Sequence, residues 1–343
     1  MSNAYRRPLA AFAATAVTFS LVACSNDGEN TETEQTADTI TIVDSTGEEK
    51  TVNVPPQRVV ATDNGSFQTL DDWGIEIVGG SRALMSEDIS YESNEDIVDL
   101  GSHNEPDLEA VVANDPDLII TGSRFSQYTE DFERLVPDAT VLDLRYDSEG
   151  NFDEELINQT EILGEIFGKE VEAAELVDDF RASIDRVKDA YNPDATVMAV
   201  ITSGGNINYA APSEGRTLGP IFDILDLTPS LEQDGSTDHQ GDEVSVETIA
   251  ESNPDFIMVM DRDAGVSSAD GTPANELLAE SAALQNVTAV QEGNVVYMPS
   301  NIYVNENIQN YTIYFNALAD AFEAYDAEQG GADDQDDAEA DES

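Results

Sequence analysis

Two segments of the chain share one pattern of apolar and polar positions. Residues 109–124 (EAVVANDPDLIITGSR) and 247–262 (ETIAESNPDFIMVMDR) each begin with a glutamate and a short helical stretch, pass through an Asx-Pro-Asp turn, and end with apolar residues and an arginine. Proline disfavours helix in the residue before it, so Pro116 and Pro254 mark helix ends. The continuous apolar runs 118–120 and 256–260 predict buried parallel strands. This repeat therefore predicts two similar α/β lobes.

The remaining elements follow from similar patterns. They are a hairpin over 39–54 with Gly47 in its turn, a strand over 58–62, a helix over 67–73 closed by Gly74, a strand over 197–202 and a helix over 217–225. The order of these elements is the same on both sides of residue 169, as two related lobes require.

A long amphipathic helix is predicted between the lobes. Its apolar positions are three or four residues apart, with charged residues on the opposite face: Val177, Phe180, Ile184, Val187 and Tyr191. The predicted fold class is therefore α/β, with two lobes that are each a parallel-type sheet flanked by helices, joined by one long helix. The predicted boundaries are 40–168 for the N-terminal lobe, 169–192 for the linking helix and 193–325 for the C-terminal lobe.

The two ends of the chain differ from the folded part. Arg6 and Arg7 precede an apolar stretch over 9–19, which is too short to span a membrane. The stretch is followed by Leu-Val-Ala-Cys at residues 21–24, which resembles the bacterial lipobox, in which the cysteine becomes the lipidated N-terminus. We expect residues 1–23 to be a lipoprotein signal peptide, 24–39 a flexible tether and 326–343 an acidic disordered tail.

The charge of the chain excludes several classes of partner. The sequence contains 14 Lys+Arg and 72 Asp+Glu, a formal net charge of −58. Such a charge repels nucleic acids and anionic lipid headgroups, so nucleic-acid binding and peripheral membrane binding are not expected. Acidic residues in place of surface lysine are typical of proteins that stay soluble in high salt. The single cysteine excludes an internal disulfide, and two histidines are too few for a multi-histidine metal site.

Three arginines are candidates for binding an anion. Arg124 and Arg262 each follow a predicted buried strand, and ligands of open α/β sheets bind outside the carboxyl ends of the strands. Arg216 follows a loop rich in proline and glycine, immediately before a predicted helix. The two lobes would therefore present arginines to one shared cleft. Pairing with nearby carboxylates is the alternative explanation for each of them.

Several of these motifs together resemble a known family. The lipobox, the segment Gly101…Glu105-Pro-Asp-Leu-Glu109, the two NPD-strand-Arg segments and the linking helix are similar to class III periplasmic-type substrate-binding lipoproteins. The motifs TSGG at 202–205, Gly215-Arg216 and Met260-Asp-Arg262 resemble those of binding proteins for ferric catecholate siderophores, over roughly residues 40–322. The resemblance implies a monomeric, lipid-anchored protein on the outer face of the cytoplasmic membrane. It would have no permanent cofactor, and would deliver a ferric siderophore to the permease of an ABC transporter.

The resemblance also implies roles for individual residues. Arg124, Arg216 and Arg262 match the arginines that clamp the catecholate oxygens, and Phe125, Tyr128 and Tyr209 lie beside these motifs, where they would stack on ligand rings or pack in the core. His239 and Tyr303 approximately match residues that complete the iron coordination in some members. The sequence around both differs from the family pattern, because the segment DHQGD around His239 has an extra residue and Asn305-Glu306-Asn307, after Tyr303, replaces a glycine-rich run. Glu109 and Glu247 match the glutamates that dock on the permease, with helix capping as the alternative role.

Other functions remain as alternatives. A hydrolase would need a catalytic setting, but the chain has no G-x-S-x-G motif and neither histidine lies in a recognisable catalytic motif. A zinc or manganese carrier would need more histidines. Another iron chelate (hydroxamate or citrate), haem and cobalamin are compatible with the same architecture. Three arginines favour an anionic catecholate or carboxylate ligand over a hydroxamate, whose complexes are often neutral or cationic.

We predict that Cys24 is the lipidated N-terminus of the mature protein. The substitution Cys24→Ala should release the protein into the medium or leave the precursor uncleaved, because the acyl acceptor is lost. Mass spectrometry of the mature protein checks this, and an unmodified N-terminus at another residue would show that the prediction is wrong.

Overall fold

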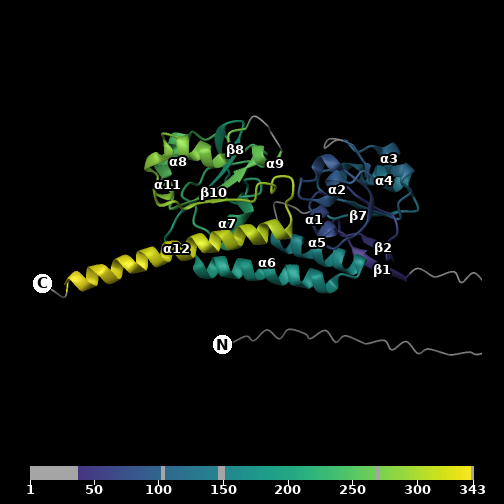
Figure 1. Cartoon of the computed structure of the whole chain (residues 1–343), viewed down its shortest axis with the longest axis horizontal. Helices are drawn as coiled ribbons and strands as arrows, with labels where there is room; N and C mark the ends of the chain where they lie inside the picture. Colours follow the sequence, from purple (N-terminus) through teal and green to yellow (C-terminus); the bar gives the residue numbers. More distant parts are fainter. Residues whose placement is uncertain (1–37, 102–104, 146–150, 267–270, 341–343) are drawn as a thin grey trace, which may run out of the picture. The chain divides into compact units, whose positions relative to one another are not determined.

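The structure is a computed structural model that describes residues 38–101, 105–145, 151–266 and 271–340, with side chains as far as residue 327. Cys24 and the predicted signal peptide lie outside these ranges. Two sheets, each with its own helices, form the two predicted lobes (Figure 1). Within the described ranges, no helix combines the length and the apolar composition that a membrane crossing requires.

The N-terminal lobe contains a parallel sheet of five strands. Its strands lie in the order β5-β4-β3-β6-β7, with bounds β3 Val59–Ala61, β4 Ile77–Gly80, β5 Val98–Asp99, β6 Leu118–Thr121 and β7 Thr140–Asp143. The predicted hairpin precedes it as the antiparallel pair β1 Asp38–Val43 and β2 Glu49–Val54. Every residue of β3 and β6 is buried, in agreement with their continuous apolar sequences.

Short helices connect the strands of this lobe. They are α1 Phe67–Asp72, the 3₁₀ turn Arg82–Leu84, α2 Ser90–Ser93, α3 Leu108–Ala113, the 3₁₀ turn Ser126–Tyr128 and α4 Thr129–Leu135. The 3₁₀ turn Arg82–Leu84 and the loop before Ser126 both follow the carboxyl ends of strands, β4 and β6 respectively. The sequence analysis expected the ligand at the carboxyl ends of the strands. These two connections form that edge of the sheet in the N-terminal lobe.

The C-terminal lobe contains a sheet of four strands. The order is β11-β10-β8-β9, with bounds β8 Val197–Ser203, β9 Asn206–Tyr209, β10 Phe256–Asp261 and β11 Val295–Tyr297. Strands β8, β10 and β11 are parallel, and β9 is an antiparallel edge strand that folds back on β8. The helices of this lobe are α7 Gly219–Leu225, α8 Val246–Ser252, α9 Arg262–Gly265, α10 Ala274–Glu280, the 3₁₀ turn Leu284–Asn286 and α11 Thr288–Glu292.

The repeated segment forms the same unit in both lobes, as the sequence predicted. Helix α3 leads to β6, and helix α8 leads to β10. The residues just after these helices adopt positive φ angles, +46° at Asp115 and +44° at Asn253, a conformation that Asp and Asn tolerate better than most residues. The Asx-Pro pair therefore ends each helix and directs the chain into a buried strand.

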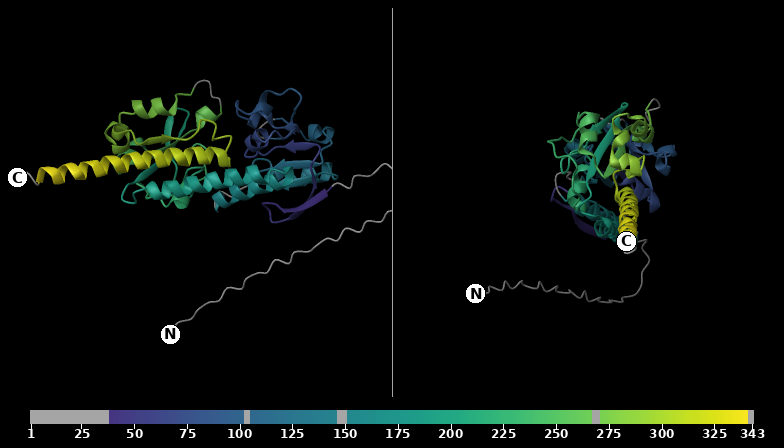
Figure 2. Two further views of the ribbon diagram at one scale, coloured as in Figure 1. Left: turned by 60° about the horizontal axis from the view of Figure 1, so that its bottom comes forward. Right: turned by 90° about the vertical axis from the view of Figure 1, so that its left-hand side faces the viewer.

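Three long helices connect and support the lobes. They are α5 Phe152–Phe167, α6 Glu170–Ala190 and α12 Ile308–Ala340, and α6 and α12 run side by side (Figure 2). The rings of Phe180 on α6 and Phe315 on α12 stack with centroids 5.7 Å apart. The predicted linking helix is present as α6, and α5 adds a connection that the sequence did not reveal. Its first half contributes Phe152 and Leu156 to the core of the C-terminal lobe, and its second half contributes Ile162, Leu163 and Ile166 to the core of the N-terminal lobe.

Helix α12 extends into the segment that the composition predicts to be disordered. It continues through residues 326–340 as far as Ala340. Elongating an existing helix needs no new nucleus, although this part of the helix contains Gly330, Gly331 and five aspartates, which are poor helix formers.

The segment that leads into α12 and the first residues of that helix are hydrogen-bonded to the N-terminal lobe. The side-chain amide of Asn64 donates to the carbonyl oxygen of Val304 at 2.7 Å, that of Asn301 to a carboxylate oxygen of Asp88 at 3.1 Å, and that of Gln309 to the hydroxyl of Thr69 at 3.0 Å. We call residues 301–309 the crossing segment. It follows β11 of the C-terminal lobe in the chain and contacts the N-terminal lobe in space.

Asp63 is a buried carboxyl group directly beyond the carboxyl end of β3. It accepts a hydrogen bond from the amide of Gln159 at 2.9 Å, and it packs so closely on Gly122 that an added Cβ there would lie 2.0 Å from its carboxylate oxygen. Burial raises the pKa of Asp63 to about 6, the charge of Asp143 adds to this rise, and hydrogen bonds from Gly65 and Ser66 oppose it. Asp63 therefore supports the loop that leads to Arg124.

We predict that Asp63 makes the free energy of unfolding fall as pH rises from about 4 to about 6. The folded state holds the proton more tightly than the unfolded chain, so this contribution is complete below the unfolded pKa and is lost as pH passes the folded pKa. Asp63→Asn should remove up to about 3 kcal/mol of this pH dependence. Denaturant unfolding between pH 4 and pH 7 measures it, with the exposed Asp138→Asn as the control. Identical pH profiles for the wild type and Asp63→Asn would contradict the prediction.

Candidate ligand-binding site

The predicted arginines line one cavity of about 730 Å³. Residues of both lobes form its walls: Arg82, Ala83, Leu84, Met85, Glu87, Glu92 and Arg124 from the N-terminal lobe, Arg216, His239, Arg262, Gly265 and Val266 from the C-terminal lobe, and Tyr303 and Val304 from the crossing segment. The sequence predicted that the carboxyl ends of the strands would bring arginines of both lobes to one cleft, and the cavity has this composition.

Two of the arginines lie on the ring of Tyr303. The guanidinium carbon of Arg216 is 4.9 Å from the ring centroid, and that of Arg262 is 5.1 Å away. Both distances are within the range of a cation–π interaction. Gly265 makes this approach possible, because a Cβ at that position would lie 2.7 Å from the Cβ of Tyr303. Tyr303, which is only 7% exposed, therefore holds two like charges at one place.

Arg262 begins helix α9 directly after β10. A terminal nitrogen of its guanidinium donates to the hydroxyl of Ser203 at 3.3 Å and lies 3.6 Å from a carboxylate oxygen of Asp263. Its Nε is buried and has no hydrogen-bond partner among the described residues. A buried donor without a partner is unfavourable, so an acceptor supplied by a ligand would stabilise this side chain.

Arg124 lies across the cavity from the C-terminal lobe, three residues after β6. Burial lowers the pKa of Arg124, the like charge of Arg216 lowers it further, and Tyr303 and Glu306 oppose the decrease. The charges of the two lobes therefore interact through the cavity. An anion bound between them would relieve their repulsion.

The cavity does not include every residue predicted from the sequence. His239 lines it and is exposed, and Tyr303 forms part of its wall. Tyr209 is buried in the C-terminal lobe, with its hydroxyl donating to the carbonyl oxygen of Leu231 at 2.8 Å, because strand alternation turns it inward. Tyr128 packs on the buried Phe125, with ring centroids 6.1 Å apart. The structure thus places these three aromatic side chains in the packing of the lobes.

One residue of the cavity wall was missed, and so was Glu306, which lines a neighbouring cavity and touches this one only through Arg216. Arg82 lines the cavity from the 3₁₀ turn after β4, where its Nε donates to the backbone oxygen of Glu92 at 2.7 Å. Its position just beyond a strand is the signal that could have identified it, since the same rule identified Arg124. Glu306 lies 3.7 Å from the guanidinium of Arg216 and accepts a hydrogen bond from the hydroxyl of Thr217. The sequence showed it only as a departure from the family pattern.

The described residues contain no group of three or more His, Cys, Asp or Glu side chains arranged to hold a metal ion. His239 is the one histidine that the described ranges include.

Glu109 and Glu247 occupy equivalent exposed positions on the two lobes. Each lies in the first turn of its helix, α3 or α8. The side chains that cap these helices are Asp107, which accepts from the amide of Ala110, and Ser245, which accepts from that of Thr248. The capping role left open for the two glutamates thus belongs to other residues.

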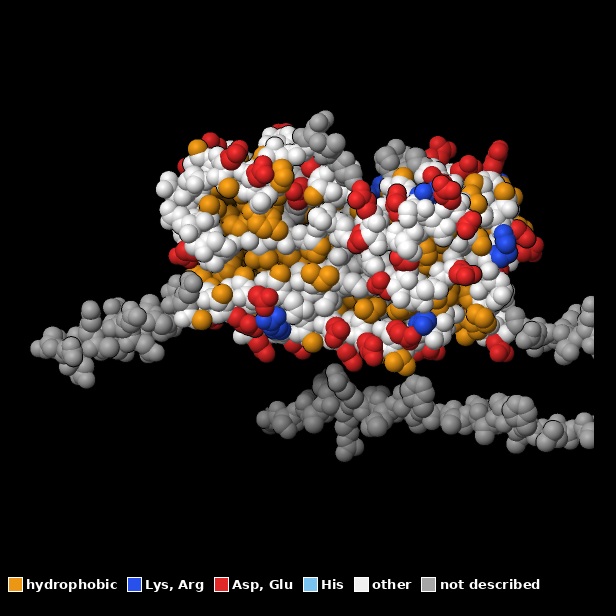
Figure 3. All heavy atoms as spheres, in the orientation of Figure 1, with side chains coloured by type: hydrophobic (Ala, Val, Ile, Leu, Met, Phe, Trp, Pro, Cys, Tyr) orange, Lys and Arg blue, Asp and Glu red, His pale blue; other side chains and the backbone are white. Residues whose placement is uncertain are grey.

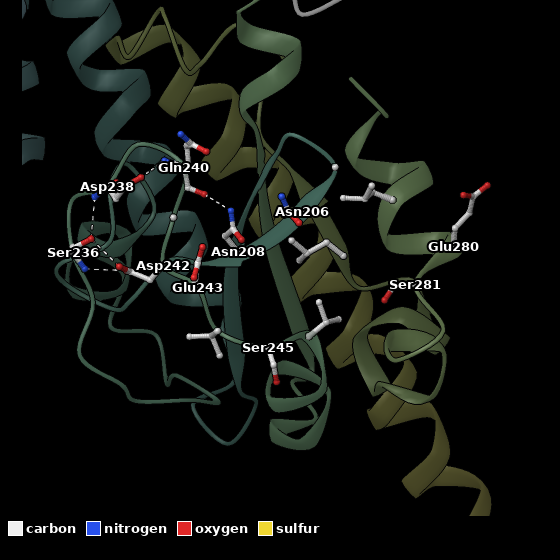
Figure 4. A pocket seen from close by; sticks show the side chains of 16 residues that line it. Asn206, Asn208, Ser236, Asp238, Gln240, Asp242, Glu243, Ser245, Glu280 and Ser281 are labelled. Atoms are coloured by element: carbon white, nitrogen blue, oxygen red, sulfur yellow. Dashed lines mark hydrogen bonds between the residues drawn. The ribbon is translucent and has the colours of Figure 1, made fainter. Parts of the chain in front are cut away.

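A second cavity of about 940 Å³ lies on the C-terminal lobe between β9, α10 and the loop before α8 (Figure 4). Its labelled side chains are polar or acidic, and several hydrogen-bond within its own wall, for example the amide of Asn208 to the carbonyl oxygen of Gln240 at 2.7 Å. None of its lining residues is an arginine, so it lacks the anion-binding groups of the first cavity.

Comparison with known proteins agrees with this architecture. Residues 59–302 match the periplasmic binding protein family. The petrobactin-binding protein YclQ of Bacillus subtilis (strain 168) is 29% identical over 282 residues, which cover 80% of this chain and 84% of that protein. The ferric-anguibactin-binding protein FatB of Vibrio anguillarum is 25% identical over 292 residues, which cover 82% of this chain and 87% of that protein.

The crystal structure of YclQ also superposes on this chain. The TM-score is 0.71, with 25% sequence identity, and the superposition covers 83% of this chain and 99% of that one. Two α/β lobes, a linking helix and the match over residues 59–302 lead to one assignment: this chain belongs to the periplasmic binding protein family.

Proposed function

We propose that the protein captures a ferric siderophore, of the catecholate type, and delivers it to an ABC transporter for iron uptake. The observation that supports this most directly is the convergence of Arg124, Arg216 and Arg262, with Arg82, on one cavity of about 730 Å³. Pockets for compact organic ligands occupy about 300–1,000 Å³, so a chelate of this size fits.

The residue type matches the proposed ligand. An arginine guanidinium stays charged, offers a planar set of donors and stacks on aromatic rings, and these properties suit the oxygens and rings of an anionic catecholate complex. His239 and Tyr303 border the same cavity. In this proposal they complete the iron coordination when the chelator leaves positions open.

The relatives support the same class of ligand. Two proteins that align with most of this chain bind petrobactin and ferric anguibactin. Delivery to a permease gives Glu109 and Glu247 a role, because each is an exposed acid at an equivalent place on its lobe. The proposal also places the monomeric protein on the outer face of the cytoplasmic membrane, anchored through Cys24.

The acidic surface affects how such a ligand binds. Asp and Glu side chains are spread over the face shown in Figure 3, where basic side chains are few. This surface repels an anion at long range, and molar salt shortens the Debye length to about 3 Å and screens the repulsion. Contacts inside the partly buried cavity are screened much less.

We predict that the affinity of the wild type for a ferric tris-catecholate stays constant or rises between low and molar salt. Each of the substitutions Arg124→Ala, Arg216→Ala and Arg262→Ala should weaken binding by about 2–5 kcal/mol. Calorimetric titration of the wild type and the single variants measures both effects. Arg134→Ala is the control, because Arg134 is exposed and paired with Asp131 on the surface. A steep fall in wild-type affinity with salt, or unchanged affinity in all three variants, would contradict the proposed clamp.

We predict that the double substitution Glu109→Arg/Glu247→Arg abolishes iron uptake and leaves ligand affinity within about twofold, since both side chains are exposed and outside the cavity. Uptake of radioactive iron by cells and calorimetry on the purified variant measure the two properties. Glu130→Arg/Glu276→Arg, which reverses one exposed charge on each lobe, is the matched control. Weakened ligand binding by the folded double variant would show that the two glutamates belong to ligand capture.

A further inference from the structure

Glu306 places a negative charge beside a cluster of arginines. It lies in the crossing segment and is 8% exposed. One of its carboxylate oxygens accepts a hydrogen bond from the hydroxyl of Thr217, and the other lies 3.7 Å from the guanidinium of Arg216. The cavity wall itself contains two carboxylates, Glu87 and Glu92, and Glu306 adds a buried third carboxylate beside Arg216.

The backbone is constrained on both sides of the hydrogen bond between Thr217 and Glu306. Thr217 has a φ of +63°, a conformation that a β-branched residue rarely adopts and that the surrounding fold must impose. Gly65 of the N-terminal lobe packs on the backbone of Glu306, where an added Cβ would lie 3.3 Å from the carbonyl oxygen.

The charge of Glu306 acts beyond its immediate partner. It opposes the decrease that burial and Arg216 cause in the pKa of Arg124, which belongs to the other lobe. It also contributes to the raised pKa of the buried Tyr311. A ligand bound among the arginines would therefore interact with this carboxylate as well as with them.

We infer that Glu306 is a specificity-determining residue whose carboxylate sets the negative charge of the chelate that the cavity accepts. The inference rests on the proposed function. Glu306 offsets one of the arginine charges, so each additional negative charge on the ligand is bound less favourably than the arginines alone would allow.

A purely structural role for Glu306 makes a different prediction. If the carboxylate only positioned Arg216 and Thr217, its loss would change the affinity for ligands of the same shape by the same factor, whatever their charge. A charge effect must distinguish two ligands of equal shape and unequal charge. The ratio of two affinities therefore separates the roles.

The test uses the Fe(III) and Ti(IV) complexes of one hexadentate tris-catecholate. The chelator and its donor oxygens are the same, and the Ti(IV) complex carries one negative charge fewer. A unit charge roughly 8 Å away, at an effective dielectric constant of about 20–40, changes affinity about five- to thirtyfold. We expect Glu306→Gln to raise the affinity for the Fe(III) complex relative to that for the Ti(IV) complex by about this factor, measured by titration at one fixed salt concentration.

Two further variants control the experiment. Glu306→Asp keeps the charge and should keep the wild-type ratio, even where absolute affinities fall because the carboxylate is displaced. Glu130→Gln removes one exposed negative charge from the N-terminal lobe outside the cavity and should also keep the wild-type ratio.

The outcomes separate this inference from the proposed function. An unchanged ratio in a folded Glu306→Gln variant, or the same change in Glu306→Asp as in Glu306→Gln, would overturn the role of Glu306 and leave the proposed function standing. Failure of the wild type to bind either complex would overturn both.

Discussion

The site depends on holding like charges together. Guanidinium groups repel one another, and Arg124, Arg216 and Arg262 remain around one cavity only because the fold fixes each of them. Strand ends place Arg124 and Arg262, the face of Tyr303 attracts Arg216 and Arg262, and Glu306 supplies an opposite charge. The cavity is consequently organised for an anion before one binds.

The elements with strong local patterns could be predicted from the sequence. Continuous apolar runs predicted β6 and β10, and proline and Asx residues predicted the ends of α3 and α8. Apolar positions at helical spacing predicted α6. Arg124 and Arg262 were identified because they lie within three residues of the end of a buried strand, which brings them to the edge of the sheet. Their position is thus a local property of the chain.

Features that depend on distant parts of the chain were missed. Nothing in the amphipathic pattern of α5 shows that its two halves join different cores. The sequence left two roles open for Tyr209, stacking on the ligand or packing in the core, and only strand alternation in the fold shows that its side chain lies inside the lobe. The partners of Glu306 are Arg216 and Thr217, about ninety residues earlier in the chain. No pattern in the sequence around Glu306 could therefore reveal its role.

Helix α5 affects how the protein unfolds, because both lobes use it. Phe152 and Leu156 pack in one core, and Ile162, Leu163 and Ile166 pack in the other, so each lobe takes part of its core from a helix that it shares with the other lobe. Dividing the chain after residue 168 would leave α5 with the N-terminal lobe. The C-terminal lobe would lose the apolar side chains of α5 from its core, and these side chains would be exposed to solvent on the N-terminal fragment. We therefore expect the two lobes to unfold in one cooperative transition.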